Sequence, residues 1–350
     1  MTLHHPARRG FASDNYAGVH PEVLAALAAA NDGHEVAYGD DSHTARLGEV
    51  MRAQFGPHAE VFPVFNGTGA NVVALTSLLP RWGAVITTST AHIHSDEGGA
   101  PEKVTGIKLF VVPTPDGKLT PELIATQAWG WGDEHRAQPL AVSITQTTEL
   151  GTLYTPDEVR AIADYAHAHG MAVHMDGARI WNAAAALGVP FREFTADAGV
   201  DVLSFGGTKI GLLGAEAVVV LDPARVEGLL YLRKSTMQLS SKMRFLSAQL
   251  LALFDDGLGL AAALHANAMA TRLRGALEQL ALPGLGFSQA TQANAVFATL
   301  DTAAADRIRE KVRFYDWDRA RGEVRWMTAF DTTEADVDDF VETIRAELAG

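Results

Sequence analysis

The chain has 350 residues, of which 47% are hydrophobic and 20% charged, and its formal net charge is −14. This length and composition suit a globular protein of about two domains, and the acidic balance argues against a nucleic-acid partner, because phosphate backbones are bound by basic surfaces. Without cysteine there is no disulfide, thiol nucleophile or thiolate metal site; with neither a membrane-length apolar run nor a signal-peptide core, we expect no membrane partner and a cytoplasmic location.

The predicted elements alternate between helices and short apolar strands. The best-marked helix begins at Pro156: Thr155 can cap its first turn, Glu158 completes a capping box, and Gly170 ends it. Helices are predicted over 21–31, 66–80 and 155–170, and strands over 60–65, 83–90, 171–176, 200–205 and 216–222. Nearly continuous apolar strands separated by helices favour an α/β fold with a mostly parallel sheet covered on both faces. We assign this large domain to residues 13–255, after a flexible tail over residues 1–12.

The pattern changes after residue 255. A long helix is followed by a strand over 294–300, a helix over 304–312, two short strands around 314–318 and 323–330, and a last helix over 334–348. We expect a smaller α/β domain over residues 256–350. Binding pockets favour the interface between such domains and the carboxyl ends of parallel strands.

Lys209 lies in a glycine-rich turn, Gly-Gly-Thr-Lys-Ile-Gly, directly after a predicted strand. A lysine is costly to bury unpaired. It is therefore either an ordinary solvated loop residue or an amine that a dry pocket keeps available as a nucleophile.

Two other turns carry polar groups at predicted strand ends. The turn at residues 66–69, Asn-Gly-Thr-Gly, leads into a helix whose N–H groups and dipole suit a phosphate, although glycine is also common in such turns for steric reasons. Asp176 ends a strand and Arg179 follows it, so they could bind a cationic ring nitrogen and an anionic oxygen, or form a structural ion pair with each other. A phosphate-binding turn, a strand-end aspartate and a glycine-flanked lysine, in this order, are what a pyridoxal 5′-phosphate (PLP) enzyme needs.

Eight segments then give a specific resemblance. They are FASDNYAG, AYGDD, FNGTGAN, AHIHSDEGGAPE, SITQTTELGT, HMDGARIWNA, FGGTKIG and SKMRFLSAQ, in chain order. Together they resemble the low-specificity L-threonine aldolases, which are fold type I PLP-dependent enzymes with an aspartate aminotransferase-like large domain. The resemblance implies reversible cleavage of L-threonine, L-allo-threonine and related L-β-hydroxy-α-amino acids to glycine and an aldehyde. It also implies a homo-oligomer, at least a dimer and more specifically a dimer of dimers.

The resemblance assigns roles residue by residue. Lys209 is the lysine that forms the Schiff base with PLP, Asp176 is the partner of the pyridine nitrogen, and His92 stacks on the cofactor ring. The phosphate is held by Asn66, Gly67 and Thr68, and by Lys242 and Arg244 from a segment that resembles one reaching a neighbouring subunit's phosphate.

The resemblance also indicates the substrate-binding residues. Arg179, Ser13 and Arg325 lie at the cofactor O3′ and the substrate carboxylate, and Tyr38 is a further substrate contact. His135 matches a histidine near the substrate hydroxyl, so His92 and His135 are both candidates for the base. Ile210 departs from the pattern, because relatives often have a polar residue after the lysine.

Two alternatives remain at this point. The same scaffold could carry another fold type I activity, such as β-elimination or transamination. A metal-dependent hydrolase could use His92 and His94, whose His-x-His spacing suits a metal, but this hypothesis leaves Lys209 and Asp176 unexplained, and we expect no metal.

Overall fold

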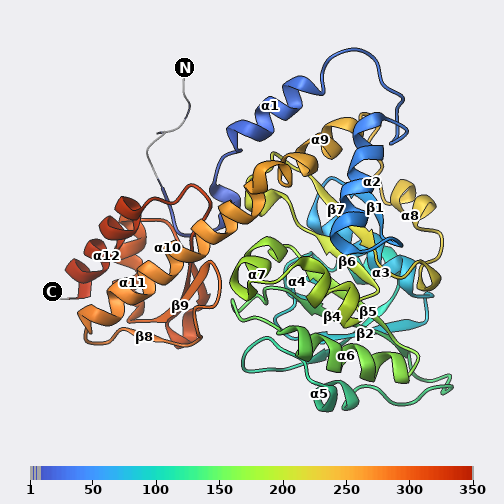
Figure 1. The fold of residues 1–350 in the computed structure, drawn as a ribbon. Coiled ribbons are helices and arrows are strands. Elements are labelled where there is room, and N and C mark those ends of the chain that lie inside the picture. The colour runs from blue at the N-terminus through green and yellow to red at the C-terminus, as the bar shows by residue number, and fades with distance from the viewer. Residues whose placement is uncertain (1–2, 4, 6–8, 349–350) are drawn as a thin grey trace.

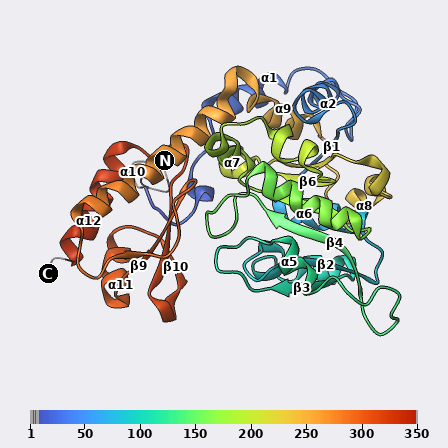
Figure 2. The ribbon, with the colours of Figure 1, turned by 60° about the horizontal axis from the view of Figure 1, so that its bottom comes forward.

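The computed structural model describes Leu3, His5 and residues 9–348. It has a larger lobe built on a seven-stranded sheet and a smaller lobe built on a four-stranded sheet, and the long helix α10 (Leu258–Leu280) runs between them (Figures 1 and 2). Of the predicted tail, residues 1–2, 4 and 6–8 lie outside the described residues, whereas Phe11 and Ala12 are buried. The domain boundary at residue 256 stays a prediction, because α10 packs against helices of both lobes.

The large sheet is mostly parallel, as predicted. Its strands are β1 (Glu60–Val64), β2 (Gly83–Thr88), β3 (Lys108–Val112), β4 (Gln138–Thr145), β5 (Ala172–Gly177), β6 (Val202–Phe205) and β7 (Glu216–Val220). Their order is β1-β7-β6-β5-β4-β2-β3, and among these seven β7 alone runs in the direction opposite to the other six. Every residue of β2, β5, β6 and β7 is buried, because helices cover both faces.

Alternating residues of the strands pack on opposite helical layers. On one face, Val202 and Val218 contact α3 (Gly67–Leu78) and α8 (Leu229–Ser235). On the other face, Leu203 and Val219 join the core formed with α2 (Ser42–Phe55), α6 (Pro156–Ala168), α7 (Ile180–Leu187) and α9 (Arg244–Ala252). The remaining helices of the large lobe are α1 (Pro21–Ala29), α4 (His92–Ser95) and α5 (Pro121–Ala125). The expected capping box at the start of α6 is present.

The small lobe is an antiparallel sheet backed by helices. Its strands β8 (Gly286–Phe287), β9 (Ala295–Thr299), β10 (Tyr315–Asp318) and β11 (Glu323–Met327) have the order β10-β11-β9-β8. Helices α11 (Thr302–Lys311) and α12 (Glu334–Leu348) join α10 in covering it. The last helix, α12, packs through one face, with Val337, Phe340 and Ile344 in the core.

The N-terminal segment connects the two lobes. The Phe11 N–H donates to Arg313 O (2.8 Å), and Met327 N–H donates to Phe11 O (2.8 Å), so Phe11 pairs with the backbone of the small lobe. Its ring stacks on Phe340 at 4.3 Å between centroids. Three residues later, Asp14 reaches the large lobe. Residues 11–14 therefore fix the position of the chain where the two lobes meet.

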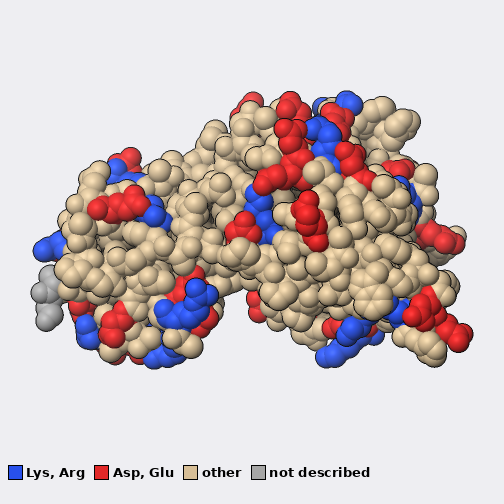
Figure 3. Space-filling model, turned by 90° about the horizontal axis from the view of Figure 1, so that it is seen from below, with Lys and Arg blue, Asp and Glu red and all other residues tan. Residues whose placement is uncertain are grey.

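The surface carries both signs of charge. On the face shown in Figure 3, acidic and basic side chains are interspersed, with wide uncharged areas between them. No single helix in the described part of the chain is long and apolar enough to cross a membrane. The helices α9 and α10 meet those criteria only together, as a pair bent by 56°.

Candidate active site

A pocket lies at the carboxyl edge of the large sheet. Strands β4, β5 and β6 end in register there, with Thr145 opposite Asp176 and Asp176 opposite Ser204. Helices α3 and α4 both begin at this edge, after β1 and β2. The pocket is lined by Gly67, Thr68, Asn71, His92, Glu97, Thr145, Glu149, Asp176, Ala178, Arg179 and Lys209. Of the residues that the sequence suggested, the structure brings six together in this lining: Gly67, Thr68, His92, Asp176, Arg179 and Lys209.

Lys209 is held by a tightly packed turn after β6. A Cβ at Gly206 would lie 2.5 Å from Ala178 O, and one at Gly207 would lie 2.4 Å from Ala215 O, so both positions require glycine. Glu216 on β7 fixes the turn by accepting hydrogen bonds from Gly207 N (2.8 Å) and Thr208 N (3.2 Å). The turn therefore presents the lysine side chain to the pocket in a defined position.

The Lys209 amine forms no hydrogen bond or ion pair with any residue that the structure describes. Burial lowers its pKa, and the nearby Arg179 guanidinium lowers it further. A less basic amine is more readily deprotonated and so a better nucleophile. Ile210, the departure from the family pattern, points into the core of the large lobe and is buried.

Asp176 is buried at the end of β5 and is oriented by two hydrogen bonds. Its Oδ2 accepts from Asn71 Nδ2 (2.8 Å), and its Oδ1 accepts from Ala178 N (3.0 Å). Arg179, which could have paired with it, pairs instead with Asp14 through two contacts, Nε to Oδ2 (2.7 Å) and Nη2 to Oδ1 (3.0 Å). The structural Asp176–Arg179 ion pair is therefore absent in this part of the described chain, and the aspartate faces the pocket.

Asp14 is a site residue that the sequence reasoning missed. Burial alone would raise its pKa, but Arg179 outweighs this and holds the pKa of Asp14 below its usual value. Asn294 of the small lobe also donates to Asp14 Oδ2 (3.1 Å). Its segment, Phe-Ala-Ser-Asp, was recognised, but no local signal indicates a partner 165 residues away.

The start of α3 offers free donors. Asn66 caps the helix by accepting from Gly69 N (2.7 Å), whereas the first N–H groups of a helix, here those of Gly67 and Thr68, have no intrahelical acceptor. A Cβ at Gly67 would meet nothing within 4 Å, so space is open beside these donors. This arrangement suits a phosphate.

His92 begins α4 and is oriented by Glu97. Its Nδ1 lies 2.9 Å from Glu97 Oε1, and the Glu97 side chain is only 1% exposed. Asn71 Nδ2 links this carboxylate (2.8 Å) to Asp176. Because Nδ1 donates to Glu97, the neutral ring keeps its lone pair on Nε2. The hydrogen bond to Glu97 raises the pKa of His92.

The predicted His-x-His pair does not converge. His94 is exposed on α4, whereas His92 lines the pocket. Among the described residues, no group of three or more His, Asp or Glu side chains is arranged to hold a metal ion.

Glu149 was also missed, since an acid in Thr-Thr-Glu-Leu-Gly carries no motif. It lines the pocket and accepts hydrogen bonds at Oε1 from His92 N (2.9 Å) and Thr145 Oγ1 (2.9 Å).

Arg325 and Ser13 lie beside the pocket rather than in its lining. Arg325 on β11 donates to Ala12 O (3.5 Å), while its Nε is buried without a partner among the described residues. Burial, with the Arg179 charge, lowers its pKa to about 10. Ser13 accepts from Asn15 N (3.2 Å) and borders a neighbouring hollow of about 860 Å³.

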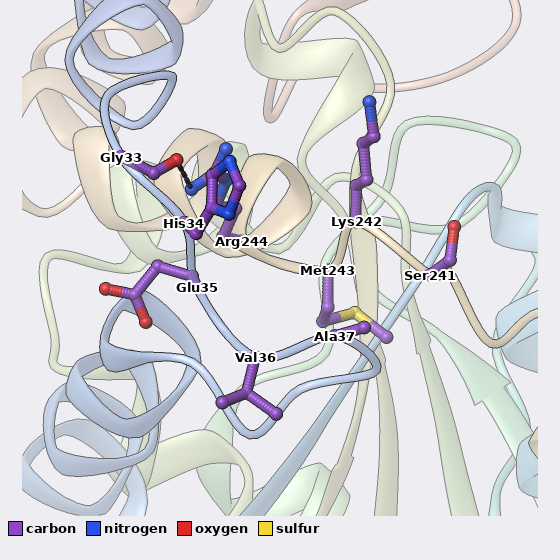
Figure 4. Close-up of a pocket in the computed structure, with 9 residues that line it drawn as sticks. All are labelled: Gly33, His34, Glu35, Val36, Ala37, Ser241, Lys242, Met243 and Arg244. Atoms are coloured by element: carbon purple, nitrogen blue, oxygen red, sulfur yellow. Dashed lines mark hydrogen bonds between the residues drawn. The ribbon is translucent and has the colours of Figure 1, made fainter.

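Three predicted residues belong to a separate region of the surface. Lys242 and Arg244 line a hollow of about 200 Å³ against the loop over residues 33–37, where Arg244 Nη1 donates to Gly33 O (3.3 Å) and Lys242 extends away from it (Figure 4). Tyr38 follows this loop and is half exposed, with Lys234 Nζ 5.2 Å from its ring centroid. None of these three lines the catalytic pocket of the same chain.

His135 lies still further away. It is exposed in the turn before β4, where its N–H donates to Asp133 Oδ1 (3.0 Å). This is the amino end of β4, at the edge of the sheet opposite the pocket.

The pocket residues fit PLP. The unpaired amine of Lys209 can bind its aldehyde, and the oriented Asp176 can bind its ring nitrogen. The free N–H groups of Gly67 and Thr68 suit its phosphate, and the flat imidazole of His92 suits its ring face. Their presence in one pocket is the observation that supports the fit.

Comparisons with known proteins agree. The model of the beta-eliminating lyase family matches residues 10–302. A low specificity L-threonine aldolase of Pseudomonas sp. (strain NCIMB 10558) is 44% identical over 341 residues, which cover 97% of this chain and 98% of the relative; one from Pseudomonas aeruginosa is 43% identical, with 96% of each chain covered. The structure of a Leishmania major threonine aldolase matches with a TM-score of 0.90 at 30% identity, over 97% of this chain and 99% of the other.

The fold and the pocket define a PLP-dependent lyase. The chain belongs to the beta-eliminating lyase family and, within it, to the low-specificity L-threonine aldolases.

Proposed function

We propose that this enzyme cleaves L-threonine, L-allo-threonine and related L-β-hydroxy-α-amino acids to glycine and an aldehyde, reversibly. The observation that carries the proposal is the unpaired Lys209 amine in one pocket with Asp176, in a chain 44% identical over 97% of its length to a low specificity L-threonine aldolase.

PLP, when bound, supplies the electron sink for the pair left on the substrate α-carbon. Lys209 Nζ would hold it covalently. The Asp176 carboxylate would keep a proton on the ring nitrogen, and Gly67 N–H and Thr68 N–H would bind the phosphate at the start of α3. Asn66 would act through its cap, which positions these donors.

Arg325 is the proposed anchor of the substrate carboxylate. Its Nε has no protein acceptor among the described residues, so an incoming anion would satisfy it. Arg179 is already bound to Asp14 and would contribute its remaining N–H groups, with Ser13 nearby. This grip would orient the substrate so that its Cα–Cβ bond is the one that breaks.

His92 is the proposed base for the β-hydroxyl proton. Glu97 occupies its Nδ1, which leaves Nε2 free to accept the proton. In its own chain His135 lies at the edge of the sheet opposite the pocket. It could therefore serve only the pocket of another subunit, if its loop reaches that pocket in an oligomer.

We further propose a homo-oligomer, as a dimer of dimers, working in the cytoplasm. Lys242, Arg244 and Tyr38 lie outside the pocket of their own chain, so in an oligomer they would serve a neighbour's phosphate and substrate. The absence of cysteine is compatible with a reducing compartment.

The test compares the wild-type enzyme with Lys209→Ala. Wild-type protein should be yellow, lose its colour to borohydride, and release glycine and aldehyde from threonine, allo-threonine and phenylserine. The alanine variant should lose turnover, because no amine remains to hold the cofactor. Release of ammonia and a keto acid instead of glycine, or normal aldol cleavage by the variant, would contradict the proposal.

A further inference from the structure

Glu149 lines the pocket but has no part in the steps proposed above. It lies in the turn after β4, where Thr148 N donates to Thr152 O (3.0 Å) and Gly151 N donates to Thr148 O (2.9 Å). Glu149 is only 9% exposed to solvent. The turn therefore places an acid inside the pocket wall, where an uncompensated charge is unfavourable.

The two carboxyl oxygens of Glu149 have different surroundings. Oε1 accepts hydrogen bonds from His92 N and Thr145 Oγ1, each at 2.9 Å. Oε2 is buried and has no partner among the residues that the structure describes. Because Oε1 already accepts two hydrogen bonds, a proton on the Glu149 carboxyl group belongs on Oε2. A neutral Glu149 would therefore present a free O–H donor.

Burial and the negative charge of Asp176 favour that neutral form and outweigh the opposing attraction of Arg179. Asp176 and Arg179 face it from the end of β5, His92 from α4, Tyr154 from the segment after its own turn, and Lys209 from the turn after β6. Burial, with the repulsion of Asp176, raises the pKa of Glu149 to about 7. Near neutrality a large share of the molecules carry the proton.

We propose that Glu149 is a ligand-binding residue of this site, whose Oε2–H donates a hydrogen bond to an anionic oxygen entering the pocket. The oxygen belongs either to the substrate carboxylate or to the phenolic O3′ of PLP. Both are anionic, and Arg179, which interacts electrostatically with Glu149, attracts either of them. The inference rests on the proposed function, because it takes an amino acid and PLP as the ligands.

Two variants separate this role from a structural one. Glu149→Gln keeps an oxygen for His92 N and Thr145, keeps a donor at the second position, and cannot titrate. Glu149→Ala removes both. Glu323→Gln, which alters a buried acid of the small lobe bonded to Ser288, is the matched control.

The experiment measures glycine binding to the PLP-loaded enzymes through the cofactor's visible spectrum, across a pH range centred on neutrality. A lost hydrogen bond to a charged group corresponds to roughly tenfold or more in affinity. We expect wild-type affinity to fall by about that factor as pH rises through the pKa of Glu149. Glu149→Gln should remove this pH step while retaining most of the affinity, and Glu149→Ala should bind about tenfold more weakly even at acid pH.

Two further titrations identify the oxygen. If Glu149→Ala weakens glycine but not 2-aminoethanol, which has no carboxylate, the acceptor is the substrate carboxylate. If it weakens PLP itself and shifts the cofactor spectrum without any amine, the acceptor is O3′. Either result supports the proposal.

The proposal is overturned if Glu149→Gln keeps the wild-type pH step, or if Glu149→Ala binds PLP and glycine normally and only its Tm falls. The second result would leave Glu149 as a support for the start of α4. Both outcomes apply only if the wild-type enzyme is yellow and cleaves threonine. A colourless wild type without that activity would instead refute the proposed function, and the inference with it.

Discussion

Asp176 is held by an amide and a backbone N–H, with no basic side chain in contact among the described residues. Its negative charge therefore remains available to a proton on the cofactor ring. We predict that Asp176→Asn lowers kcat roughly a hundredfold or more, because the charge opposite the ring nitrogen is lost. Asparagine keeps the size but only one of the two acceptors, so Tm should fall modestly while the protein stays folded. An unchanged kcat would mean that Asp176 only orders the turn after β5.

The His92–Glu97 pair gives a prediction about pH. A base works in its neutral form, so activity rises as pH passes the pKa of His92, which the hydrogen bond to Glu97 raises. In Glu97→Gln the acceptor for Nδ1 remains while the charge is lost, so the pKa of His92 falls. The acid limb of the kcat profile should therefore move to lower pH, with a lower plateau because the base is weaker. A limb that stays in place would show that another group takes the proton.

Five residues of the pocket could be predicted from the sequence, because each lies in a short motif at a strand or helix end: Lys209, Asp176, Gly67, Thr68 and His92. Their partners could not. Asp14, Asn71 and Glu97 are ordinary residues by local pattern. Asp14 and Asn71 reach the site through contacts between distant segments, and 105 residues separate Asn71 from Asp176.

The turn after β6 shows how closely elements approach at the site. We predict that Gly206→Ala lowers both Tm and PLP affinity, because its Cβ would lie within 2.8 Å of three backbone atoms of Ala178, which lines the pocket. Gly275→Ala in α10 is the matched change: a Cβ there meets nothing within 4 Å, and alanine is the better helix former by about 1 kcal/mol. It should raise Tm slightly and leave PLP affinity unchanged. Equal effects of the two substitutions in thermal melts would refute the packing argument.

Many elements with strong local signals were predicted, but not all. The central and mostly buried strand β4 was missed, as were the helices α2, α7 and α9. The buried strands β2, β5, β6 and β7 have continuous apolar sequences, and α6 has its capping box. The strand β3 was missed because it lies at the sheet edge and is only partly buried, beginning with an exposed Lys108. The two-residue β8 depends on pairing with β9 and has no pattern of its own.

At the scale of the whole molecule, the fold class and family could be predicted because the matching segments extend over most of the chain. The homo-oligomer that the resemblance implies stays a prediction, because a single chain contains only half of any interface. Lys242 and Arg244, on one side of the hollow in Figure 4, carry the expectation that neighbouring chains complete each other's sites.

Mixing a weakened and an inactive variant tests this expectation. Arg244→Ala should weaken PLP binding and activity, because a neighbour's phosphate would lose a cation, whereas Lys209→Ala inactivates its own site. Subunits exchanged between the two should form hybrids in which one site has both residues, so activity should reappear. Sizing chromatography should show an oligomer throughout. A fully active monomer, or mixtures that stay inactive under proven subunit exchange, would contradict shared sites.

The pairing of the N-terminal segment with distant partners has a consequence for biosynthesis. Phe11 and Asp14 leave the ribosome long before their partners, which are Arg179, Asn294, Arg313, Met327 and Phe340. Since domains tend to fold as they emerge, the large sheet can form before the N-terminal segment has all of its partners. The contacts of Asp14 with both Arg179 and Asn294 are complete only after Asn294 has been translated. The catalytic pocket therefore matures last, and a nascent chain stalled before the small lobe has a sheet but not a finished site.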